Sequence, residues 1–212
     1  MIDSSSYAIV LLPDEGLLDK TIQTSCMLRS FGTRFCLQKD TFFPHMTLYM
    51  AQIPNSSLKQ IQAALSHIAK QTEAFSLRAT KYHQDREGMI EVQYEKTDAL
   101  VFLQREIIRA VNPLREGLRE RNPLGYFLKD QLSHATGEEK ENLEKYGYDE
   151  IGMLFRPHIT FTRLINKEKM FALSLLPPVE QFSGSFPVIG FFTLGENGTC
   201  MEQIDTINLK NS

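Results

Sequence analysis

Pro157-His158-Ile159-Thr160-Phe161 has a pattern of proline, histidine, apolar residue, threonine and apolar residue that occurs a second time at Pro44-His45-Met46-Thr47-Leu48. Successive side chains of an extended strand point to opposite faces, so each copy places an imidazole and a hydroxyl on one face and two apolar side chains in a core. With average amino-acid usage, two such pentapeptides around any of the five histidines should occur by chance in roughly one chain in 10⁵. We therefore predict that the two copies together form one site.

Length and composition limit the class of protein to which this pair belongs. The 212 residues, 42% of them hydrophobic, are enough to bury one core, in a single domain or in two closely packed lobes. A net charge of -3 argues against a protein that coats nucleic acid with a broad basic surface. A small anionic substrate or the end of an RNA is compatible with it, and we expect no DNA partner.

The N-terminal region and the cysteines indicate the compartment. Asp3 stands where a secretory signal would carry basic residues, and the apolar run 8–12 is too short for a signal or a membrane span. We therefore expect a cytoplasmic protein without a membrane partner. Cys26, Cys36 and Cys200 are odd in number and lack metal-ligand spacing, which predicts neither a disulfide framework nor a zinc site. We interpret them as buried free thiols.

Hydrophobic periodicity predicts a similar order of elements in the two parts of the chain. In the first part we predict a strand over 7–12, a helix over 17–31, a motif strand over 42–53, a helix after Pro54-Asn55-Ser56, and strands over 75–82 and 89–94. In the second part we predict a helix from 98 to about 112, a further helical piece to 121, a motif strand over 155–165, a short helix over 167–175, and strands over 182–194 and 199–209. Asn197-Gly198 between the last two strands predicts a hairpin.

This order favours an α+β fold made of a duplicated unit. We expect a single bilobal domain over 1–212, with two antiparallel sheets facing a central cleft, helices on the outside and a pseudo-twofold axis relating the two units. Such an axis would bring His45 and His158 together across the cleft, although they are far apart in the sequence. Residues 131–150 are polar and acid-rich without a clear apolar stripe, which predicts a solvated helical insertion or a mobile loop.

The two motifs His45-Met46-Thr47-Leu48 and His158-Ile159-Thr160-Phe161, in this order of elements, resemble the two-histidine (2H) phosphoesterases. Among these, the chain is most similar to the bacterial RNA 2′,3′-cyclic phosphodiesterases, also called 2′-5′ RNA ligases. The resemblance implies catalysis by the two histidines and phosphate binding by Thr47 and Thr160, with no metal and no other cofactor. It implies that a monomer hydrolyses a 2′,3′-cyclic phosphate, on a small nucleotide or an RNA terminus, to a 2′-phosphate.

The chemistry of such a reaction calls for these residue types. In-line attack on a cyclic phosphodiester needs one base for water and one acid for the leaving alkoxide, and imidazoles with a pKa near 6.5 can hold both states at neutral pH. Which histidine is the base stays open at this point. Because one histidine must be protonated and the other neutral, we expect a bell-shaped pH dependence within roughly pH 5 to 8.5. The threonine hydroxyls would donate to the equatorial phosphoryl oxygens.

Strand alternation suggests further cleft residues. Phe43 and Tyr49 would share the face of His45, and Arg156 would share the face of His158. Tyr49 or Phe43 could stack on a base and Arg156 could bind a phosphate oxygen, and for Tyr49 and Arg156 ordinary packing or an ion pair is an equal alternative.

Other polar residues near the motifs are interpreted as structural or peripheral. Thr162 shares the face of the second motif histidine, whereas Arg163 points to the opposite face in a regular strand. The histidines without a threonine two residues later are expected at the surface or in capping roles: His67, His83 and His134.

Four alternatives to a cyclic phosphodiesterase remain. A non-catalytic module of the same fold could bind a nucleotide phosphate with the same residues, and an enzyme of the same fold could cleave or join 2′,5′ linkages. A metalloenzyme is less favoured, since two histidines without clustered Asp, Glu or Cys do not complete a set of metal ligands. A protein-interaction role for residues 131–150 is the weakest alternative.

Overall fold

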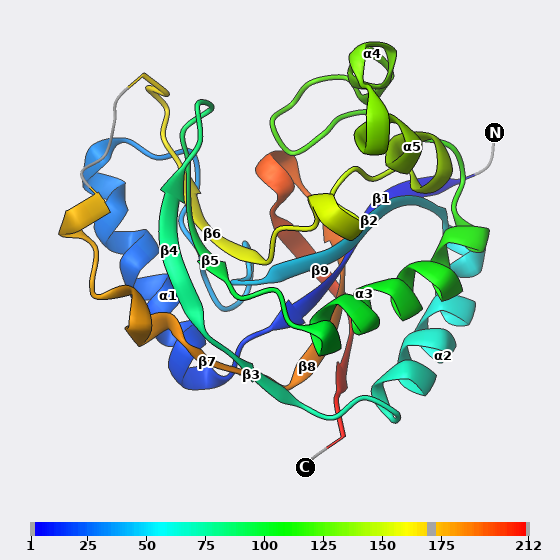
Figure 1. Cartoon of the computed structure of the whole chain (residues 1–212), viewed down its shortest axis with the longest axis horizontal. Coiled ribbons are helices and arrows are strands. Elements are labelled where there is room, and N and C mark those ends of the chain that lie inside the picture. The colour runs from blue at the N-terminus through cyan, green and yellow to red at the C-terminus, as the bar shows by residue number, and fades with distance from the viewer. Residues whose placement is uncertain (1–2, 169–172, 211–212) are drawn as a thin grey trace.

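The two motif strands lie next to each other at the centre of one large antiparallel sheet (Figure 1). In this computed structural model, which describes residues 3–168 and 173–210, β2 (Met46–Pro54) and β6 (His158–Arg163) are antiparallel and pair only at Met46 and Ile159. The seven strands follow the order β4-β5-β6-β2-β1-β8-β9, and β3 and β7 form a second, two-stranded sheet. The predicted α+β fold is confirmed, and its two sheet halves meet at a single pair.

The remaining elements have the following bounds. The other strands are β1 (Ser4–Leu12), β3 (Phe75–Leu77), β4 (Ala79–Gln84), β5 (Met89–Tyr94), β7 (Gly184–Phe186), β8 (Val188–Leu194) and β9 (Cys200–Asn208). The α-helices are α1 (Glu15–Leu28), α2 (Leu58–Ala69), α3 (Asp98–Val111), α4 (Leu128–His134) and α5 (Gly137–Tyr146). Within the described residues, no helix is both long and apolar enough to cross a bilayer.

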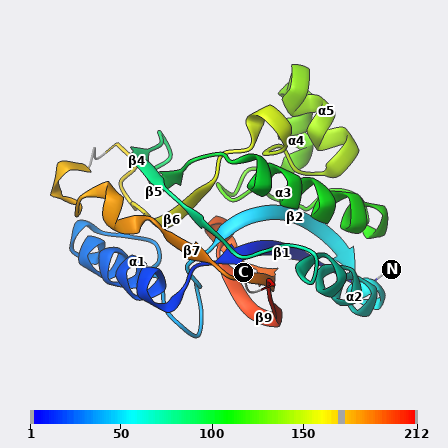
Figure 2. The same ribbon diagram turned by 60° about the horizontal axis from the view of Figure 1, so that its bottom comes forward.

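Each half of the sheet combines strands from distant parts of the chain. One half holds β2, β1, β8 and β9, and helices α2 and α3 pack together against it (Figure 2). The other half holds β4, β5 and β6, and α1 from the start of the chain packs on β6 from its later part. The predicted repeat has its boundary at the middle of the chain. In the fold, each half of the sheet instead contains elements from both parts of the chain.

Local sequence explains why the helices begin and pack as they do. The Asp14 carboxylate accepts a hydrogen bond from the backbone N–H of Leu17 at 2.9 Å, and Thr97 caps α3 in the same way. The stripe predicted for α3 is buried on the sheet: Leu100, Leu103, Ile107, Ile108 and Val111. Burying each such side chain stabilises the fold by about 1.5–3 kcal/mol.

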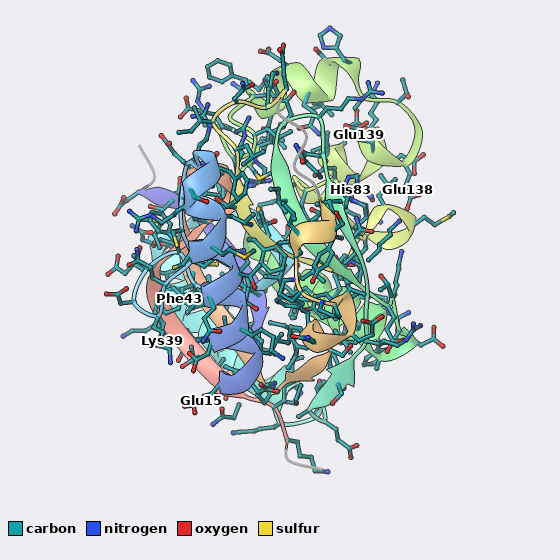
Figure 3. The ribbon with its side chains drawn as sticks, turned by 90° about the vertical axis from the view of Figure 1, so that its left-hand side faces the viewer. Glu15, Lys39, Phe43, His83, Glu138 and Glu139 are labelled. Carbon is teal, nitrogen blue, oxygen red and sulfur yellow. The ribbon has the colours of Figure 1, made fainter. Side chains whose placement is uncertain are left out.

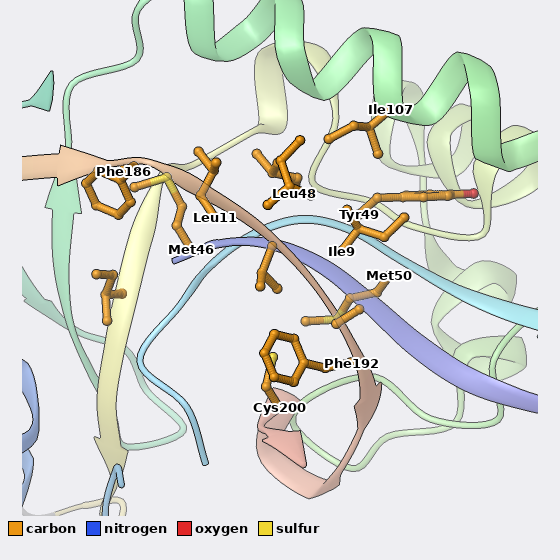
Figure 4. Close-up of a cluster of buried hydrophobic side chains, with 14 of the residues drawn as sticks. Ile9, Leu11, Met46, Leu48, Tyr49, Met50, Ile107, Phe186, Phe192 and Cys200 are labelled. Carbon is orange, nitrogen blue, oxygen red and sulfur yellow. The ribbon is translucent and has the colours of Figure 1, made fainter. Parts of the chain in front are cut away.

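A β-bulge occurs at the same motif position in both central strands. Against β1, the pairing changes register between Ile9 and Val10 so that Leu48 of β2 is the extra residue. Against β5, the register change between Ile90 and Glu91 makes Phe161 of β6 the extra residue. A bulge reverses the alternation of side chains that follows it. Leu48 and Tyr49 therefore both lie on the α3 side of β2, and Met50 lies on the other side (Figure 4).

Several predicted boundaries need correction. The helical piece predicted up to Arg121 is wrong: a single 3₁₀ turn, Asn112–Leu114, is followed by extended backbone at Arg115. Pro187 separates β7 from β8 where one strand was predicted. Of the helix predicted over 167–175, residues 169–172 lie outside the described residues, and Leu173–Leu175 is a 3₁₀ turn. The hairpin at Asn197-Gly198 is confirmed, with both residues at positive φ.

Candidate active site

A cavity of about 280 Å³ opens where β2 and β6 meet. It receives side chains from both sheet halves, from the segment after α1, from the loop before α4, and from the hairpin after β8. The lining residues are Phe35, Leu37, His45, Thr47, Met50, Asp85, Met89, Glu91, Asn122, Pro123, Leu124, Gln131, Tyr148, Asp149, Glu150, Arg156, His158, Thr160, Asn197, Gly198 and Thr199. All four motif residues with a polar side chain are therefore in one cleft.

The two motif histidines are held by the same backbone hydrogen bond. Nδ1 of His45 is 2.6 Å from the carbonyl oxygen of Phe43, and Nδ1 of His158 is 2.7 Å from the carbonyl oxygen of Arg156. A carbonyl can only accept, so Nδ1 carries a proton in both rings. Nε2 is then the nitrogen that is left for proton exchange in each ring.

The surroundings of the two imidazoles differ in charge. Burial, with a smaller contribution from the positive charge of His158, lowers the pKa of His45 to about 4, against the opposing effects of backbone hydrogen bonds with Phe43 and Gly198. Nε2 of His158 instead lies 3.6 Å from a carboxylate oxygen of Glu91 on β5. His45 is thus neutral at physiological pH, whereas His158 lies beside the carboxylate of Glu91.

Glu91 is a buried carboxylate with only 3% of its surface exposed. Burial alone would raise its pKa, but the charge of His158, a hydrogen bond from Gln93 and the charge of Arg156 together lower the pKa below its usual value. The hydrogen bond from Gln93 is 2.7 Å long, and the one from Arg156 is 3.1 Å long. Glu91 is therefore an ionised group beside the second motif histidine.

Arg156 joins two carboxylates that line the cleft. Its guanidinium donates to Glu91 at 3.1 Å and to Glu150 at 2.9 Å. Burial would lower the pKa of Arg156, but Glu150 and Glu91 raise it. The ion pair that the sequence left as one alternative is present, and the side chain also lines the cleft.

Tyr49 and Phe43 do not line the cleft, contrary to the prediction. The Tyr49 side chain is 1% exposed and its hydroxyl donates to the Asn112 side chain at 2.9 Å and to the Tyr146 carbonyl at 2.7 Å. The bulge at Leu48 turns Tyr49 to the α3 side and brings Met50 into the cleft (Figure 4). Phe43 packs on Phe192, with ring centroids 4.8 Å apart.

The second bulge relocates residues that follow the later motif. Thr162 is fully buried outside the cleft and donates to the Phe35 carbonyl at 2.6 Å. Arg163 donates to the Asn197 side chain at 3.1 Å and to backbone carbonyls of Glu87 and Leu124. These contacts connect β6 to the loop and hairpin that wall the cleft. The histidines outside the motifs are absent from the cleft lining formed by the described residues: His67, His83 and His134.

Two contributions to the cleft were not predicted from the sequence: Glu91 and the side chains from residues 131–150. Glu91 interrupts the apolar run of a predicted strand, and that was the available signal for a buried charge. Residues 131–150 do more than contact solvent, since Gln131, Tyr148 and Asp149 line the cleft. Gln131 fixes this region by donating to Asp149 and Glu139, each at 3.0 Å.

Comparisons with known proteins agree with this geometry. A family model described as "Protein of unknown function (DUF1045)" matches residues 49–179. A crystal structure of a phosphoesterase is similar with a TM-score of 0.62 and 12% identity over 98% of this chain and 99% of that one. Crystal structures of Escherichia coli LigT with NADP+ and with 3′-AMP are similar with TM-scores of 0.59 and 0.56 and identities of 12% and 13%, over 98% of this chain and 99% of LigT. No curated protein matches the sequence. The fold predicted from the two motifs, that of LigT and the two-histidine phosphoesterases, is confirmed.

Proposed function

The chain belongs to the DUF1045 family, and we propose that it is a metal-independent phosphodiesterase that hydrolyses a 2′,3′-cyclic phosphate to a 2′-phosphate. The observation that carries this proposal is the pair of equivalent imidazoles in one cleft, one neutral and one facing a carboxylate. A two-histidine acid and base reaction requires that two chemically identical groups have different surroundings, so that one accepts a proton and the other donates one.

The geometry favours His45 as the base and His158 as the acid. Nε2 of His45 takes a proton from water as the water oxygen bonds to phosphorus. The bond between phosphorus and the ribose 3′ oxygen breaks on the opposite side, and Nε2 of His158 gives its proton to that oxygen. Thr47 and Thr160 donate to the non-bridging oxygens, where negative charge is held in the transition state. The two histidines exchange their protons with solvent to return to the starting state.

The walls of the cleft fit a nucleotide end. Phe35, Leu37 and Met50 are apolar residues of the cleft lining on which a base can lie, the role that the sequence suggested for Tyr49. LigT has been crystallised with 3′-AMP, ATP and NADP+, which supports a nucleotide substrate for a protein of the same fold. An apolar wall contacts every base, so we expect little preference among the four bases.

A catalytically silent phosphate-binding module is less consistent with the two histidines. Holding an anion is favoured by positive charge on both imidazoles, whereas the pKa of His45 near 4 leaves that ring uncharged at neutral pH. An uncharged His45 imidazole binds phosphate more weakly, but it can accept a proton as a base.

Phosphorus NMR of the reaction with 2′,3′-cyclic AMP tests the proposal. We expect one product, the 2′-phosphate, formed at the same rate in the presence of EDTA. Formation of both the 2′- and the 3′-phosphate contradicts the proposed orientation in the cleft. Binding of a nucleotide monophosphate without turnover favours the silent module, and activity that EDTA removes and zinc, manganese or magnesium restores favours a metalloenzyme.

A further inference from the structure

Two cysteines lie in contact beside the candidate active site. Cys26 is on α1 and Cys36 is in the segment that follows this helix, and their Sγ atoms are 2.9 Å apart. Both are free thiols, Cys26 is exposed and Cys36 is partly exposed. The prediction of buried thiols is confirmed for Cys200 and is wrong for Cys26. A disulfide bond is about 2.05 Å long, so the two sulfurs have to approach by only about 0.9 Å to form one.

Cys36 stands between two residues of the cleft wall. Phe35 and Leu37, its neighbours in sequence, both line the cavity that contains the motif histidines. Figure 3 views α1 from outside, with Lys39 and Phe43 of the following segment beside it, and Lys39 forms a 2.6 Å ion pair with Asp19 of the helix. The segment therefore contacts both α1 and the cleft.

Hydrogen bonds attach this segment to α1 and to the second motif strand. The Leu37 backbone N–H donates to the Ser25 hydroxyl at 2.9 Å, and that hydroxyl donates to the Phe161 carbonyl at 2.6 Å. On the next residue of β6, Thr162 donates to the Phe35 carbonyl at 2.6 Å. A covalent bond at Cys36 would add to contacts that already hold the cleft wall to the residues after the second histidine motif.

We propose that Cys26 and Cys36 form a thiol–disulfide exchange site that reacts with low-molecular-weight disulfides, and that the resulting protein disulfide fixes the cleft wall of Phe35 and Leu37 to α1. One cysteine thiolate attacks a sulfur of the small disulfide, which forms a mixed disulfide and releases one small thiol. The second cysteine thiolate then attacks the protein sulfur and releases the second small thiol. The two protons lost by the cysteines are taken up by the two small thiols, so the protein is oxidised by two electrons and the small disulfide is reduced.

The thiols of Cys26 and Cys36 are more accessible than the thiol of Cys200. Cys200 is buried, and burial raises its pKa, so it is expected to remain reduced. The hydrogen bond with Cys36 and burial raise the pKa of Cys26, and the charge of Arg29 opposes this effect. Because a thiolate is the attacking species, the exchange should become faster as the pH rises above neutral.

Oxidised glutathione is a suitable probe of the whole chain. After incubation and alkylation of the remaining thiols, mass spectrometry should show two thiols lost, one remaining at Cys200, and the peptides of Cys26 and Cys36 linked. Closing a short ring by a disulfide should raise Tm on the order of 5 °C, and dithiothreitol should reverse the change. Cys200→Ser should behave as the wild type, whereas Cys26→Ser and Cys36→Ser should form at most a mixed disulfide with glutathione.

Two outcomes overturn the proposal. If the wild type keeps three alkylatable thiols, or forms only bonds between molecules, the site does not exchange as proposed. Hydrogen exchange of residues 33–38 measures the second part of the proposal, since the backbone N–H of Leu37 is in this segment. We expect slower exchange after oxidation, and unchanged exchange with the disulfide formed refutes the effect on the cleft wall. None of these measurements depends on phosphodiesterase activity.

Discussion

Glu91 on β5 and His158 on β6 face each other in the cleft, with 3.6 Å between the carboxylate Oε2 and the imidazole Nε2. The other motif histidine, His45, has no equivalent carboxylate among the described interactions and is neutral because it is buried. The carboxylate of Glu91 thus gives the second motif histidine a charged neighbour that the first motif histidine lacks among the described interactions. This asymmetry supports the proposed roles of His45 as the base and His158 as the acid, which the sequence left open.

Replacing either motif histidine should abolish most of the activity. We expect His45→Ala and His158→Ala each to lower kcat on 2′,3′-cyclic AMP by about 10²- to 10⁴-fold, the usual contribution of a positioned acid or base. Because both act in the same step, the double variant should lose much less than the product of the two single losses. Circular dichroism should show an unchanged fold, and near-normal activity of a pure single variant rules out the paired mechanism.

The acidic side of the pH profile should report His45. A base must be neutral to accept a proton, so with a pKa lowered to about 4 it stays active until the pH approaches that value. The acidic limb of kcat/KM should therefore lie below the range of roughly pH 5 to 8.5 that unperturbed histidines predict. An acidic limb near pH 6.5 contradicts the environment described for His45.

The same lowered pKa has a consequence for stability. Between pH 6.5 and about 4 the unfolded chain binds a proton at His45 that the folded chain does not, so this residue makes the free energy of unfolding decrease as the pH falls. Urea titrations across this range should show a smaller decrease for His45→Gln. This measurement separates loss of the fold from protonation of the base.

Glu91→Gln should weaken the acid without removing it. The amide keeps the size of the side chain but places no negative charge opposite Nε2 of His158, so we expect kcat to fall on the order of tenfold at neutral pH. Glu150→Gln is the matched control, since Glu150 contacts Arg156 at 2.9 Å and makes no described contact with His158. An equal effect of both substitutions would indicate that only the ion pair with Arg156 matters.

The threonines should contribute less than the histidines. Thr47→Val and Thr160→Val remove one hydroxyl each and keep the branched shape, so we expect losses of about 10- to 10³-fold, mainly in kcat. Single-turnover measurements should show slower chemistry with product release unchanged. A change confined to KM would instead indicate that the hydroxyls hold the substrate and the transition state equally well.

Tyr49→Phe should reduce stability and leave catalysis unchanged. The substitution deprives the Asn112 side chain and the Tyr146 carbonyl of a buried donor, which costs about 1–3 kcal/mol of the free energy of unfolding. For a chain of this size a loss of 1 kcal/mol lowers Tm by roughly 2–4 °C. Phe35→Leu at the cleft wall should instead raise KM. A higher KM for Tyr49→Phe at unchanged stability would restore a role for Tyr49 in base binding.

Sequence periodicity predicted the motif strands correctly as far as the threonines and not beyond them. His45 and Thr47 share a face as alternation requires, but Tyr49 does not, because the bulge at Leu48 depends on how β2 pairs with β1. Strand pairing is a property of the partner strand, and no local signal in the pentapeptides predicts it. The corresponding bulge at Phe161 explains in the same way why Thr162 leaves the cleft.

The polar neighbours of the motifs were harder to predict than the motifs themselves. Glu91 lies 67 residues before His158, and only the adjacency of β5 and β6 brings them together. Helices α4 and α5 pack on a small separate cluster formed by Leu128, Ala135 and Leu143. So few buried apolar side chains leave no apolar stripe in residues 131–150. Their cleft residues, Gln131 and Asp149, are polar side chains of the kind that also occurs on any solvated surface.

The orienting partner of each imidazole belongs to the peptide backbone, and every amino acid provides it. Phe43 and Arg156 have nothing in common as side chains, yet their carbonyl oxygens fix the same ring orientation at 2.6 and 2.7 Å. Amino-acid substitutions at these two positions can therefore alter the size, charge or packing of the side chain and still leave the proton on Nδ1 of the histidine. A search for a third side chain that completes a triad with either histidine would overlook this support, since it is not encoded by the identity of any residue.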